Sequence, residues 1–552
     1  MHIELIFPSG KKKRYKNSVL VGEVMTDKEF NCEKNSIVAA LLNNEVVSLS
    51  YCIPVNGLIK PVYLNSPEGT TLYRRTLCFL LAIASKRLFP ERRLIIGHSL
   101  GEGYYYHFDA LDHVSDGEIR ELDKQMKRLV RENHPIQHKV ISYLEAVDYF
   151  KKDKQPNTAL FLKYQNRTKV PVYQCLDVID LAHGPLLSHT GCLKIFELKN
   201  YRPGFLLRFP TAGGENKIPP LEKNPVLFSV YKEYKSWGKV LNMSCVGLLN
   251  QLIIEGNIKE FIQVSEALHD KKIANIADRI SERRDVLRLI LIAGPSSSGK
   301  TTFSKKLAIQ LRVIGRNPVT VSLDDYFLPR ENTPLDENGE PDFETLEAID
   351  ISLLNSHLIK LFNGEEILIP SYDFITGRRK EKGNALMLPQ RSIVILEGIH
   401  GLNERLTPQI RKDQKFKIYV SALTQLNLDD HNRISTTDNR LIRRIVRDRQ
   451  FRGHSALDTM GMWPSVSRGE DKFIFPFQNG ADEAFNSALD YELSVLKLYA
   501  EPLLRTIKPD VKEYGEARRL LSFIENFLPI KPTLVPSQSI LREFIGESEF
   551  KY

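Results

Sequence analysis

Cysteine, tryptophan and long apolar runs are scarce in this sequence of 552 residues. The 6 cysteines form no C-x-x-C pair, which argues against both a disulfide framework and a zinc site of the usual spacing. No apolar run approaches the ~18–20 residues of a membrane span, and the longest candidate, Leu77 to Ala84, fits a core helix. The cysteines are Cys32, Cys52, Cys78, Cys175, Cys192 and Cys245.

The first residues also lack the features of a secretory signal. "MHIELIFPSGKKKR" has neither a long apolar stretch nor a small-residue cleavage site, so we expect a cytoplasmic protein with no membrane segment. The net charge of +9 suits anionic ligands such as nucleotides or RNA and does not choose between them. The length alone predicts about three or four domains.

A glycine-rich loop is the strongest positive signal. "GPSSSGKTT", Gly294 to Thr302, has the spacing G-x-x-x-x-G-K-[ST], whose glycines let consecutive N–H groups turn toward phosphate oxygens. Lys300 would reach the β- and γ-phosphates, and Thr301 would place its hydroxyl on Mg²⁺. The residues expected to bind the nucleotide are Gly294, Ser296, Ser297, Ser298, Gly299, Lys300, Thr301 and Thr302.

The context of this loop is right for a phosphate-binding site. Residues 287–293, "LRLILIA", predict a buried parallel strand, and residues 301–313, "TTFSKKLAIQLRV", predict an amphipathic helix. A flexible Ser/Gly linker would not be flanked by a core strand and a core helix. The sequence therefore predicts a P-loop domain with a doubly wound parallel sheet.

Acidic residues stand where two further strands of that sheet are expected to end. "VTVSLDDYF" ends a strand on Asp324 and Asp325, and "SIVILEGIHGL" ends another on Glu397. Ligands bind at the carboxyl ends of the strands in such sheets. We therefore expect one carboxylate to accept a proton from an attacking hydroxyl and the other, with Thr301, to hold Mg²⁺.

The region resembles the uridine kinase family, which includes uridine-cytidine kinases. Four motifs in order carry the resemblance: "GPSSSGKTT", "SLDDYF", "IPSYDFITGRR", and "ILEGI" followed by "DNRLIRRIVRDRQFRG". The resemblance implies an ATP- and Mg²⁺-dependent kinase that phosphorylates the 5′-hydroxyl of a nucleoside, with Asp324 rather than Asp325 as the general base. It places Phe343 and Glu344 beside the nucleoside. Tyr372 and Phe374 fall at the aromatic wall of the base pocket, where stacking would hold a ring.

Arginines recur on one face of the predicted helix at the last motif. Four like charges on one helix face repel one another, and this arrangement is favourable where an anion binds to that face. In the family this helix is a mobile lid, and Arg444 and Arg447 would stabilise the transferring phosphoryl group with Lys300. The alternative is a basic solvated helix, with Asp438 and Asp448 neutralising part of the charge. The four are Arg440, Arg443, Arg444 and Arg447.

The match to the family fails at the acceptor end. Gly377 stands where the family has a histidine, and His454 where it has an arginine. Losing a donor that reads the base lowers discrimination, although Arg378 or Arg379 could substitute. Phosphate transfer is thus better supported than uridine or cytidine as acceptor, and a kinase for another small polar alcohol, like the related phosphoribulokinases, stays open.

The first 65 residues resemble the TGS domain, a β-grasp module at the front of threonyl-tRNA synthetases. "HIELIFPSGKKKRYKN" predicts two strands around a turn, "SIVAALLNN" predicts a helix, and "EVVSLSYCI" and "GLIKPVYL" predict further strands. The basic "KKKR", Lys11 to Arg14, could contact an RNA backbone, although such a turn is more often a solvated hairpin tip.

Residues 66–225 resemble the α+β editing domain of threonyl-tRNA synthetases without its chemistry. The family joins an H-x-x-x-H pair to a C-x-x-x-H pair. Arg75, Phe79, Ala182 and Leu186 stand at those four positions. We expect the nearby histidines to be surface or core residues rather than a displaced metal or acid/base site; they are His98, His107, His183 and His189.

The chain is therefore expected to be a multidomain α/β protein. A helical connector is predicted at 226–285, the kinase-like domain at 286–528 and a Pro-rich tail at 529–552. The contrasting hypothesis is an RNA-binding regulatory protein whose P-loop domain senses nucleotides. Retention of Asp324, Glu397 and the arginines favours the enzyme, and the sequence leaves the oligomeric state open.

Overall fold

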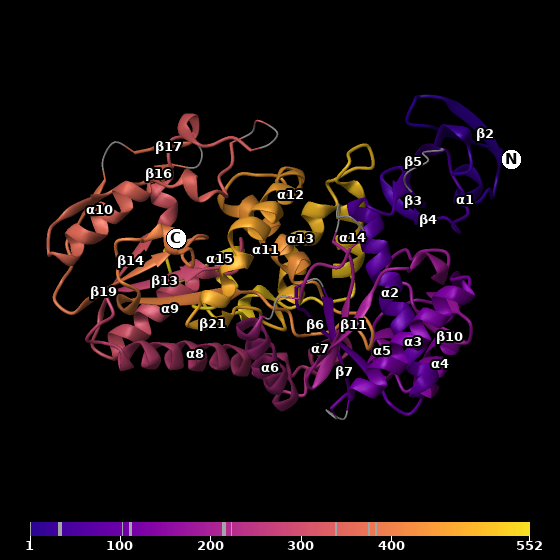
Figure 1. Ribbon diagram of the computed structural model, residues 1–552, viewed down its shortest axis with the longest axis horizontal. Helices are drawn as coiled ribbons and strands as arrows, with labels where there is room; N and C mark the ends of the chain where they lie inside the picture. Colours follow the sequence, from indigo (N-terminus) through magenta and orange to yellow (C-terminus); the bar gives the residue numbers. More distant parts are fainter. Residues whose placement is uncertain are drawn as a thin grey trace.

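The computed structural model describes residues 2–30, 36–101, 103–109, 113–211, 217–221, 224–336, 339, 341–373, 376–380 and 383–551. Cys32 and Phe374 lie outside the described residues. The N-terminal sheet and the parallel sheet lie at opposite ends of the molecule (Figure 1). Across the described part of the chain, no helix has both the length and the apolarity that crossing a bilayer requires.

The N-terminal unit is a five-stranded sheet in the order β2-β1-β5-β3-β4, in which β1 and β5 are parallel. The helix predicted for "SIVAALLNN" is wrong, because Ile37–Leu42 forms β3 between β5 and β4. Asn43 and Asn44, both at positive φ, turn β3 into β4, as a tight hairpin requires. The elements are β1 (His2–Ile6), β2 (Lys12–Lys16), α1 (Val21–Val24), β3 (Ile37–Leu42), β4 (Glu45–Ser48) and β5 (Gly57–Tyr63).

The next part combines two antiparallel sheets with four helices. One sheet has the order β10-β9-β8 and the other β11-β12-β7-β6. Helix α2 begins at the cap residue Ser66, whose hydroxyl accepts the Gly69 N–H, and its apolar side packs into a core shared with β7 and β12. The elements are α2 (Pro67–Leu88), β6 (Leu94–Ser99), β7 (Gly103–Phe108), α3 (Asp116–Glu132), β8 (Gln137–Ser142), α4 (Tyr143–Lys152), α5 (Pro156–Lys163), β9 (Lys169–Cys175), β10 (Val178–Leu181), β11 (Glu197–Tyr201) and β12 (Gly204–Arg208).

Three helices connect this part to the parallel sheet: α6 (Pro225–Val240), α7 (Val246–Glu255) and α8 (Ile258–Glu282). Helix α8 runs along one side of the molecule and contacts α9, the helix after the glycine-rich loop (Figure 1). Its residues Phe261, Ile273 and Ile276 are buried in the same core as the parallel sheet. The connector is therefore part of the folded body and not a loose linker.

The second half is built on a five-stranded, fully parallel sheet in the order β14-β19-β13-β20-β21. All residues of β13 are buried, as expected for a central strand covered on both faces. The predicted strand, loop and helix are confirmed as β13, residues 294–299 and α9. The elements are β13 (Leu289–Ala293), α9 (Lys300–Val313), β14 (Asn317–Ser322), α10 (Ile351–Phe362), β19 (Ser392–Glu397), β20 (Lys415–Ser421), α11 (Thr436–Phe451), α12 (Ala456–Phe473), β21 (Glu483–Asn486), α13 (Glu492–Leu504), α14 (Tyr514–Ile524) and α15 (Arg542–Ile545).

Two short hairpins stand between α10 and β19. Strands β15 (Ile367–Ile369) and β18 (Asn384–Leu386) form the first, and β16 (Tyr372–Asp373) and β17 (Arg378–Arg379) form the second. The second hairpin contacts the turn after β14, so it lies beside the carboxyl edge of the sheet and over the place where the acceptor was predicted to bind.

Candidate functional site

The loop between β13 and α9 has the conformation that its glycines require. A Cβ on Gly294 would collide with the Val420 carbonyl oxygen, so only glycine fits there. Gly299 caps α9 at φ +81°, and Ser297 also has a positive φ of 58°. The loop thus presents backbone N–H groups at the start of a 14-residue helix, which is a favourable place for an anion.

Lys300 and Thr301 open the helix next to two carboxylates. The Lys300 ammonium donates to the Pro295 carbonyl oxygen at 3.2 Å, and the Thr301 hydroxyl donates to Glu397 Oε1 at 3.1 Å. Burial lowers the pKa of Lys300, while Glu397 and Asp324 act in the opposite direction. Lys300 and Thr301 therefore lie in one site with the two predicted acids, Asp324 and Glu397.

The sheet register explains why the acids meet. Glu397 at the end of β19 pairs with Ser322 of β14 on one side and Ile292 of β13 on the other. Asp324 follows in the 3-10 turn Leu323–Tyr326. Glu397 is 8% exposed, and burial first, then Asp324, raises its pKa to about 7 against the effect of Lys300. Burial and the neighbouring Asp324 thus disfavour the charged form of Glu397.

A magnesium ion fits this set of groups. The Thr301 hydroxyl touches the Glu397 carboxylate, and Mg²⁺ prefers few protein oxygens, keeping waters and phosphate as its other ligands. The described residues contain no group of three or more His, Cys, Asp or Glu side chains that could hold a metal ion by themselves. The buried hydroxyls of Ser297 and Ser298 have no hydrogen-bond partner among the described residues, which suits a loop built for a phosphate.

The arginine helix divides into two pairs. Arg440 and Arg443 are buried ion-pair partners of Glu470 and Glu492. Their side chains also donate to the carbonyl oxygens of the loop, Arg440 to Ser296 at 2.9 Å and Arg443 to Ser297 at 3.3 Å. These two hold the loop in place through their contacts, and the role of the helix as a lid stays a prediction.

Arg444 and Arg447, the other pair, both bond Asp448 of the same helix. Arg444 donates to the Ser296 hydroxyl at 2.8 Å and lies 3.2 Å from Asp448. Arg447 also bonds Asp448 at 2.8 Å. Asp448 thus neutralises part of the charge, as anticipated, and the catalytic role of the two arginines stays a prediction.

The residues predicted for the acceptor side belong to an aromatic group around Phe327. The ring of Phe327 lies 6.1 Å from Phe343, edge to face, and 5.7 Å from Tyr372. Tyr372 is buried in the local core and Phe343 packs against it. Phe374, predicted for the same wall, lies outside the described residues.

Glu344 links the acceptor side to the loop. Burial and Glu470 raise its pKa to about 7, opposed by Arg444 and Lys300. Its Cβ also faces Gly469 of α12, where any larger residue would collide with it. Glu344 therefore lies close to Arg444 and Lys300, and its contact with the acceptor stays a prediction.

The departures from the family pattern have structural counterparts. Gly377 has φ +70°, and Arg330 Nε lies 2.8 Å from where its Cβ would be, so Arg330 occupies the space of the missing histidine. Arg379 donates to the carbonyl oxygens of Phe327 and Tyr326 and pairs with Asp350. Arg379 is thus a structural residue and does not replace a base-reading donor.

Sequence reasoning missed three residues at this site. Glu470 accepts the Ser296 N–H at 2.9 Å as well as pairing with Arg440. Arg452 has a pKa lowered to about 10, chiefly by Arg447 and then by burial, with Asp324 opposing. Glu543 bonds the N–H and the hydroxyl of Thr302. Neither glutamate stands in a recognisable motif, and Arg452 was quoted within a motif without being weighed.

In the front half, the segments that carry the four editing positions lie close together, and the side chain of Arg75 occupies the space between them. Arg75 of α2 packs against Gly184, where a Cβ would collide with its guanidinium, and burial lowers its pKa. The Leu187 N–H donates to the Thr76 hydroxyl at 2.9 Å. Part of the charge of the basic turn in the N-terminal sheet is also paired, since Lys13 pairs with Asp27. An RNA contact stays a prediction.

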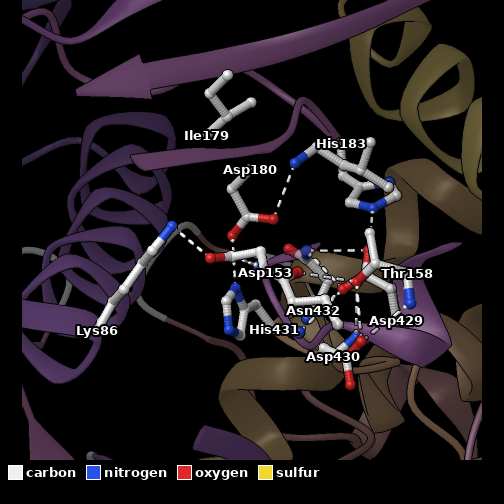
Figure 2. Close-up of polar contacts among 12 residues, drawn as sticks. Lys86, Asp153, Thr158, Ile179, Asp180, His183, Asp429, Asp430, His431 and Asn432 are labelled. Carbon is white, nitrogen blue, oxygen red and sulfur yellow. Dashed lines mark hydrogen bonds and ion pairs between the residues drawn. The ribbon is translucent and has the colours of Figure 1, made fainter. Parts of the chain in front are cut away.

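The segment 427–433, which leads from β20 to α11, docks into this front half (Figure 2). Asp430 pairs with Arg93 and accepts the Thr158 N–H at 2.9 Å. His183 bonds Asp429 at 2.5 Å, and the ring of His431 bonds Asp180 at 3.0 Å. We name Arg93, Thr158, Asp180, His183, Asp429, Asp430 and His431 the interface cluster.

The charges of the interface cluster balance one another. Burial opposes the charge of His431, but Asp180 outweighs it and raises its pKa to about 9. Burial likewise opposes the Asp429 carboxylate, yet His183 lowers its pKa below the ordinary value. His98 and His107 are buried, and burial lowers their pKa values to about 3 and about 4. These histidines behave as structural residues, as predicted.

Comparison with known proteins also separates a front half from a kinase-like second half. Residues 289–494 match the model of the phosphoribulokinase / uridine kinase family. That match spans the glycine-rich loop, both acids, the hairpins and the arginine helix. The small-substrate P-loop kinase predicted for this half is thus supported at the level of the family.

The N-terminal region matches threonine–tRNA ligases. The ligase of Thermotoga maritima is 30% identical over 234 residues, 42% of this chain and 34% of that protein. Threonine–tRNA ligase 2 of Bacillus subtilis is 28% identical over 198 residues, 36% of this chain and 31% of that protein. The chain thus spans about a third of the length of the curated relatives it matches.

Two solved structures overlap with the second half. One is a possible uridine kinase from Bacillus stearothermophilus, at 16% identity and a TM-score of 0.25, covering 38% of this chain and 100% of that one. The other is D-glycerate 3-kinase from Cryptococcus neoformans, at 14% identity and a TM-score of 0.23, covering 46% of this chain and 87% of that one. The parallel sheet and its loop, rather than these overlaps, define the fold.

Proposed function

We propose that this protein is an ATP-dependent kinase that transfers the γ-phosphoryl group to the 5′-hydroxyl of a nucleoside, with uridine and cytidine as the preferred acceptors. One observation carries the proposal. Asp324 follows the end of β14 and Glu397 ends the adjacent β19, at the edge where Lys300 and Thr301 open the phosphate-binding helix. A nucleotide sensor needs the loop and its metal ligands, whereas only a transferase also needs a second acid for the proton of the acceptor.

The residues divide the work by position. The loop N–H groups and Lys300 bind the phosphates of the donor, and Thr301 with Glu397 holds Mg²⁺. The ion, when bound, neutralises charge on the phosphoryl group. Asp324 accepts the proton of the attacking hydroxyl, and the nucleoside diphosphate leaves. Arg444 and Arg447 stabilise the charge of the group in transfer.

The acceptor side favours a ring-bearing alcohol. The rings of Phe343 and Tyr372 both contact that of Phe327, and aromatic faces hold a base mainly by stacking. Glu344 has a carboxyl oxygen to offer to a ribose hydroxyl. Its pKa of about 7 allows it to accept or donate a hydrogen bond near neutral pH.

A kinase for another small polar alcohol is the second candidate. The observation in its favour is Arg330, whose guanidinium fills the space over Gly377. A guanidinium donates to anionic or carbonyl groups through a planar fork, and its pattern differs from that of an imidazole. An acceptor with an acidic group would meet this arginine better than uridine would.

A panel of acceptors separates the two candidates. ATP turnover would be followed with nucleosides and with sugar, polyol and hydroxy-acid acceptors, and the phosphorylated product identified by mass spectrometry and ³¹P NMR. The proposal expects stimulation by uridine or cytidine and formation of the 5′-monophosphate. Stimulation only by an acidic alcohol would favour the second candidate, and no stimulation by any acceptor would contradict both.

A further inference from the structure

The segment 530–551 returns to the phosphate-binding loop. Its helix α15 contacts α11 and lies beside α9 (Figure 1). The apolar side chains of Ile540, Leu541 and Phe544 are fully buried in the core of the second half. Ile540 reaches the loop itself, since its Cγ2 lies 2.6 Å from where a Cβ on Gly299 would be. The predicted tail is therefore a packed part of the kinase-like half.

Glu543 extends from this segment to the start of α9. Its Oε2 accepts the Thr302 N–H at 3.0 Å and the Thr302 hydroxyl at 2.7 Å. Thr302 is the third residue of α9, so its N–H lies in the first turn, at the positive end of the helix dipole. This is a position that a P-loop offers to a phosphate oxygen.

The other acids of the segment do not reach the loop. Glu547 pairs with Arg542 at 3.0 Å, and Glu549 accepts from Gln538 at 2.8 Å. Arg542 in turn donates to the carbonyl oxygens of Pro532 at 3.0 Å and Val535 at 2.7 Å. Arg542 therefore stabilises the shape of the segment, and Glu543 is its acid that reaches the loop.

The carboxylate of Glu543 adds to a site already rich in negative charge. It acts on Lys300 together with Glu397 and Asp324, and it contributes to the raised pKa of Glu397. A nucleotide brings several more negative charges to the same place. A phosphate and the Glu543 carboxylate cannot both accept from Thr302, because each would need the same N–H and repel the other.

We propose that the segment 530–551 is a built-in competitor of the nucleotide, in which the Glu543 carboxylate stands in for a phosphate at Thr302. The nucleotide phosphate binds there only after Glu543 leaves, so the segment lowers the apparent affinity for the donor. The proposal rests on the proposed function only in taking the loop as the donor site. A protein or ligand that draws the segment away would activate the enzyme.

The first test is the affinity for MgADP, which needs no acceptor. Glu543→Ala removes the competing carboxylate, and Glu549→Ala is the matched control on the same segment. Calorimetric titration should give about tenfold or tighter binding to Glu543→Ala than to the wild type, because a site occupied by its own carboxylate is only fractionally competent. Glu549→Ala should bind as the wild type does.

The opposite sign overturns the proposal. If Glu543→Ala binds MgADP equally or more weakly than the wild type, Glu543 does not compete with the nucleotide. If neither protein binds MgADP, the loop is not a donor site, and the proposed function fails as well. Phosphoryl transfer need not be observed for this comparison, so the two ideas can fail separately.

A second measurement uses the unaltered protein. Hydrogen–deuterium exchange of residues 540–546 should become faster when MgADP is added, while exchange at the loop becomes slower. Slower exchange in both segments would mean that Glu543 stays beside the bound nucleotide. That result would contradict the proposal that Glu543 competes with the nucleotide.

Discussion

The interface cluster and the phosphate site are both groups of buried charges, yet they are balanced in different ways. In the interface cluster, Asp430 meets Arg93 and His431 meets Asp180. At the phosphate site, burial and Asp324 raise the pKa of Glu397 to about 7 against the effect of Lys300. The Ser297 and Ser298 hydroxyls find no partner among the described residues.

The difference separates a structural cluster from a binding site. A buried polar network whose members are all paired fixes a geometry and needs nothing more. A site with excess charge and unpaired donors costs stability, which a protein tolerates where a ligand later supplies the missing groups. The front half therefore fixes the second half in position through the segment 427–433, and the chemistry lies at the loop.

Removing a charge from the paired cluster should have the largest effect on stability. Asp430 is 1% exposed and bonds both Arg93 and Thr158. Asp430→Ala leaves the Arg93 charge and the Thr158 N–H without this partner, so we expect a loss of about 3–5 kcal/mol. Thermal and urea unfolding should show it as a lower midpoint, and the two halves should separate more easily under limited proteolysis.

Asp109 offers the matched control, because it contacts the same arginine from the surface. Arg93 lies 3.3 Å from Asp109, whose side chain is 60% exposed. Asp109→Ala should cost no more than about 1 kcal/mol. Equal losses for the two variants would show that the interface cluster is not the tight contact described here.

At the phosphate site, removing a charge should instead stabilise the ligand-free protein. The pKa of Glu397 is about 7 in the folded protein against 4.5 for the free group. The protonated carboxyl therefore makes its full contribution to the free energy of unfolding below pH 4.5, and this contribution is lost as the pH rises through 7. Glu397→Gln should gain roughly 2 kcal/mol more over the wild type at pH 8 than at pH 5.5, without nucleotide or Mg²⁺.

Glu404 is the control with the opposite sign. Burial would raise its pKa, but Lys417 and Lys415 lower it below the ordinary 4.5. Its contribution is present above that value and is lost as the pH falls. Glu404→Gln should therefore be less stable than the wild type at pH 8. If Glu397→Gln gains equal stability at both pH values, the charge of Glu397 does not destabilise the ligand-free protein and this account of the phosphate site is wrong.

The smallest expected change in the free energy of unfolding comes from comparing two buried serines. Ser298 and Ser304 are both fully buried. The Ser304 hydroxyl donates to the Thr301 carbonyl oxygen at 2.8 Å, whereas that of Ser298 has no partner among the described residues. Ser304→Ala should cost about 1 kcal/mol, and Ser298→Ala about 0. Equal losses would mean that the Ser298 hydroxyl is already satisfied and does not wait for a phosphate.

The sequence predicted those parts of the fold whose signal is local. The strand, loop and helix around residues 289–313 carry their own periodicity and glycine spacing, and both acids follow strand ends. "SIVAALLNN" was assigned to a helix because its apolar run has no clear period. Ile37–Leu42 forms a strand because it pairs with β4 on one side and β5 on the other, and these pairings are not visible in the segment's own sequence.

The rest of the site depends on contacts between distant segments. The spacing of the arginines placed four charges on one face, but only the fold shows that Arg443 is buried against Glu492. Glu543 lies 241 residues from Thr302, and nothing in the tail marks it as a ligand of the loop. Such pairings follow from packing, for which a single sequence has no periodic signal.

The most direct test of the account compares two neighbouring aspartates. Asp324→Asn removes the proposed proton acceptor, while Asp325→Asn changes an acid that accepts the Tyr372 N–H at 3.4 Å. With saturating MgATP and acceptor, Asp324→Asn should lose at least about 10²-fold in kcat and still bind MgADP, and Asp325→Asn should lose far less. An Asp324→Asn enzyme with kcat near that of the wild type would contradict the central claim that this residue takes the acceptor's proton.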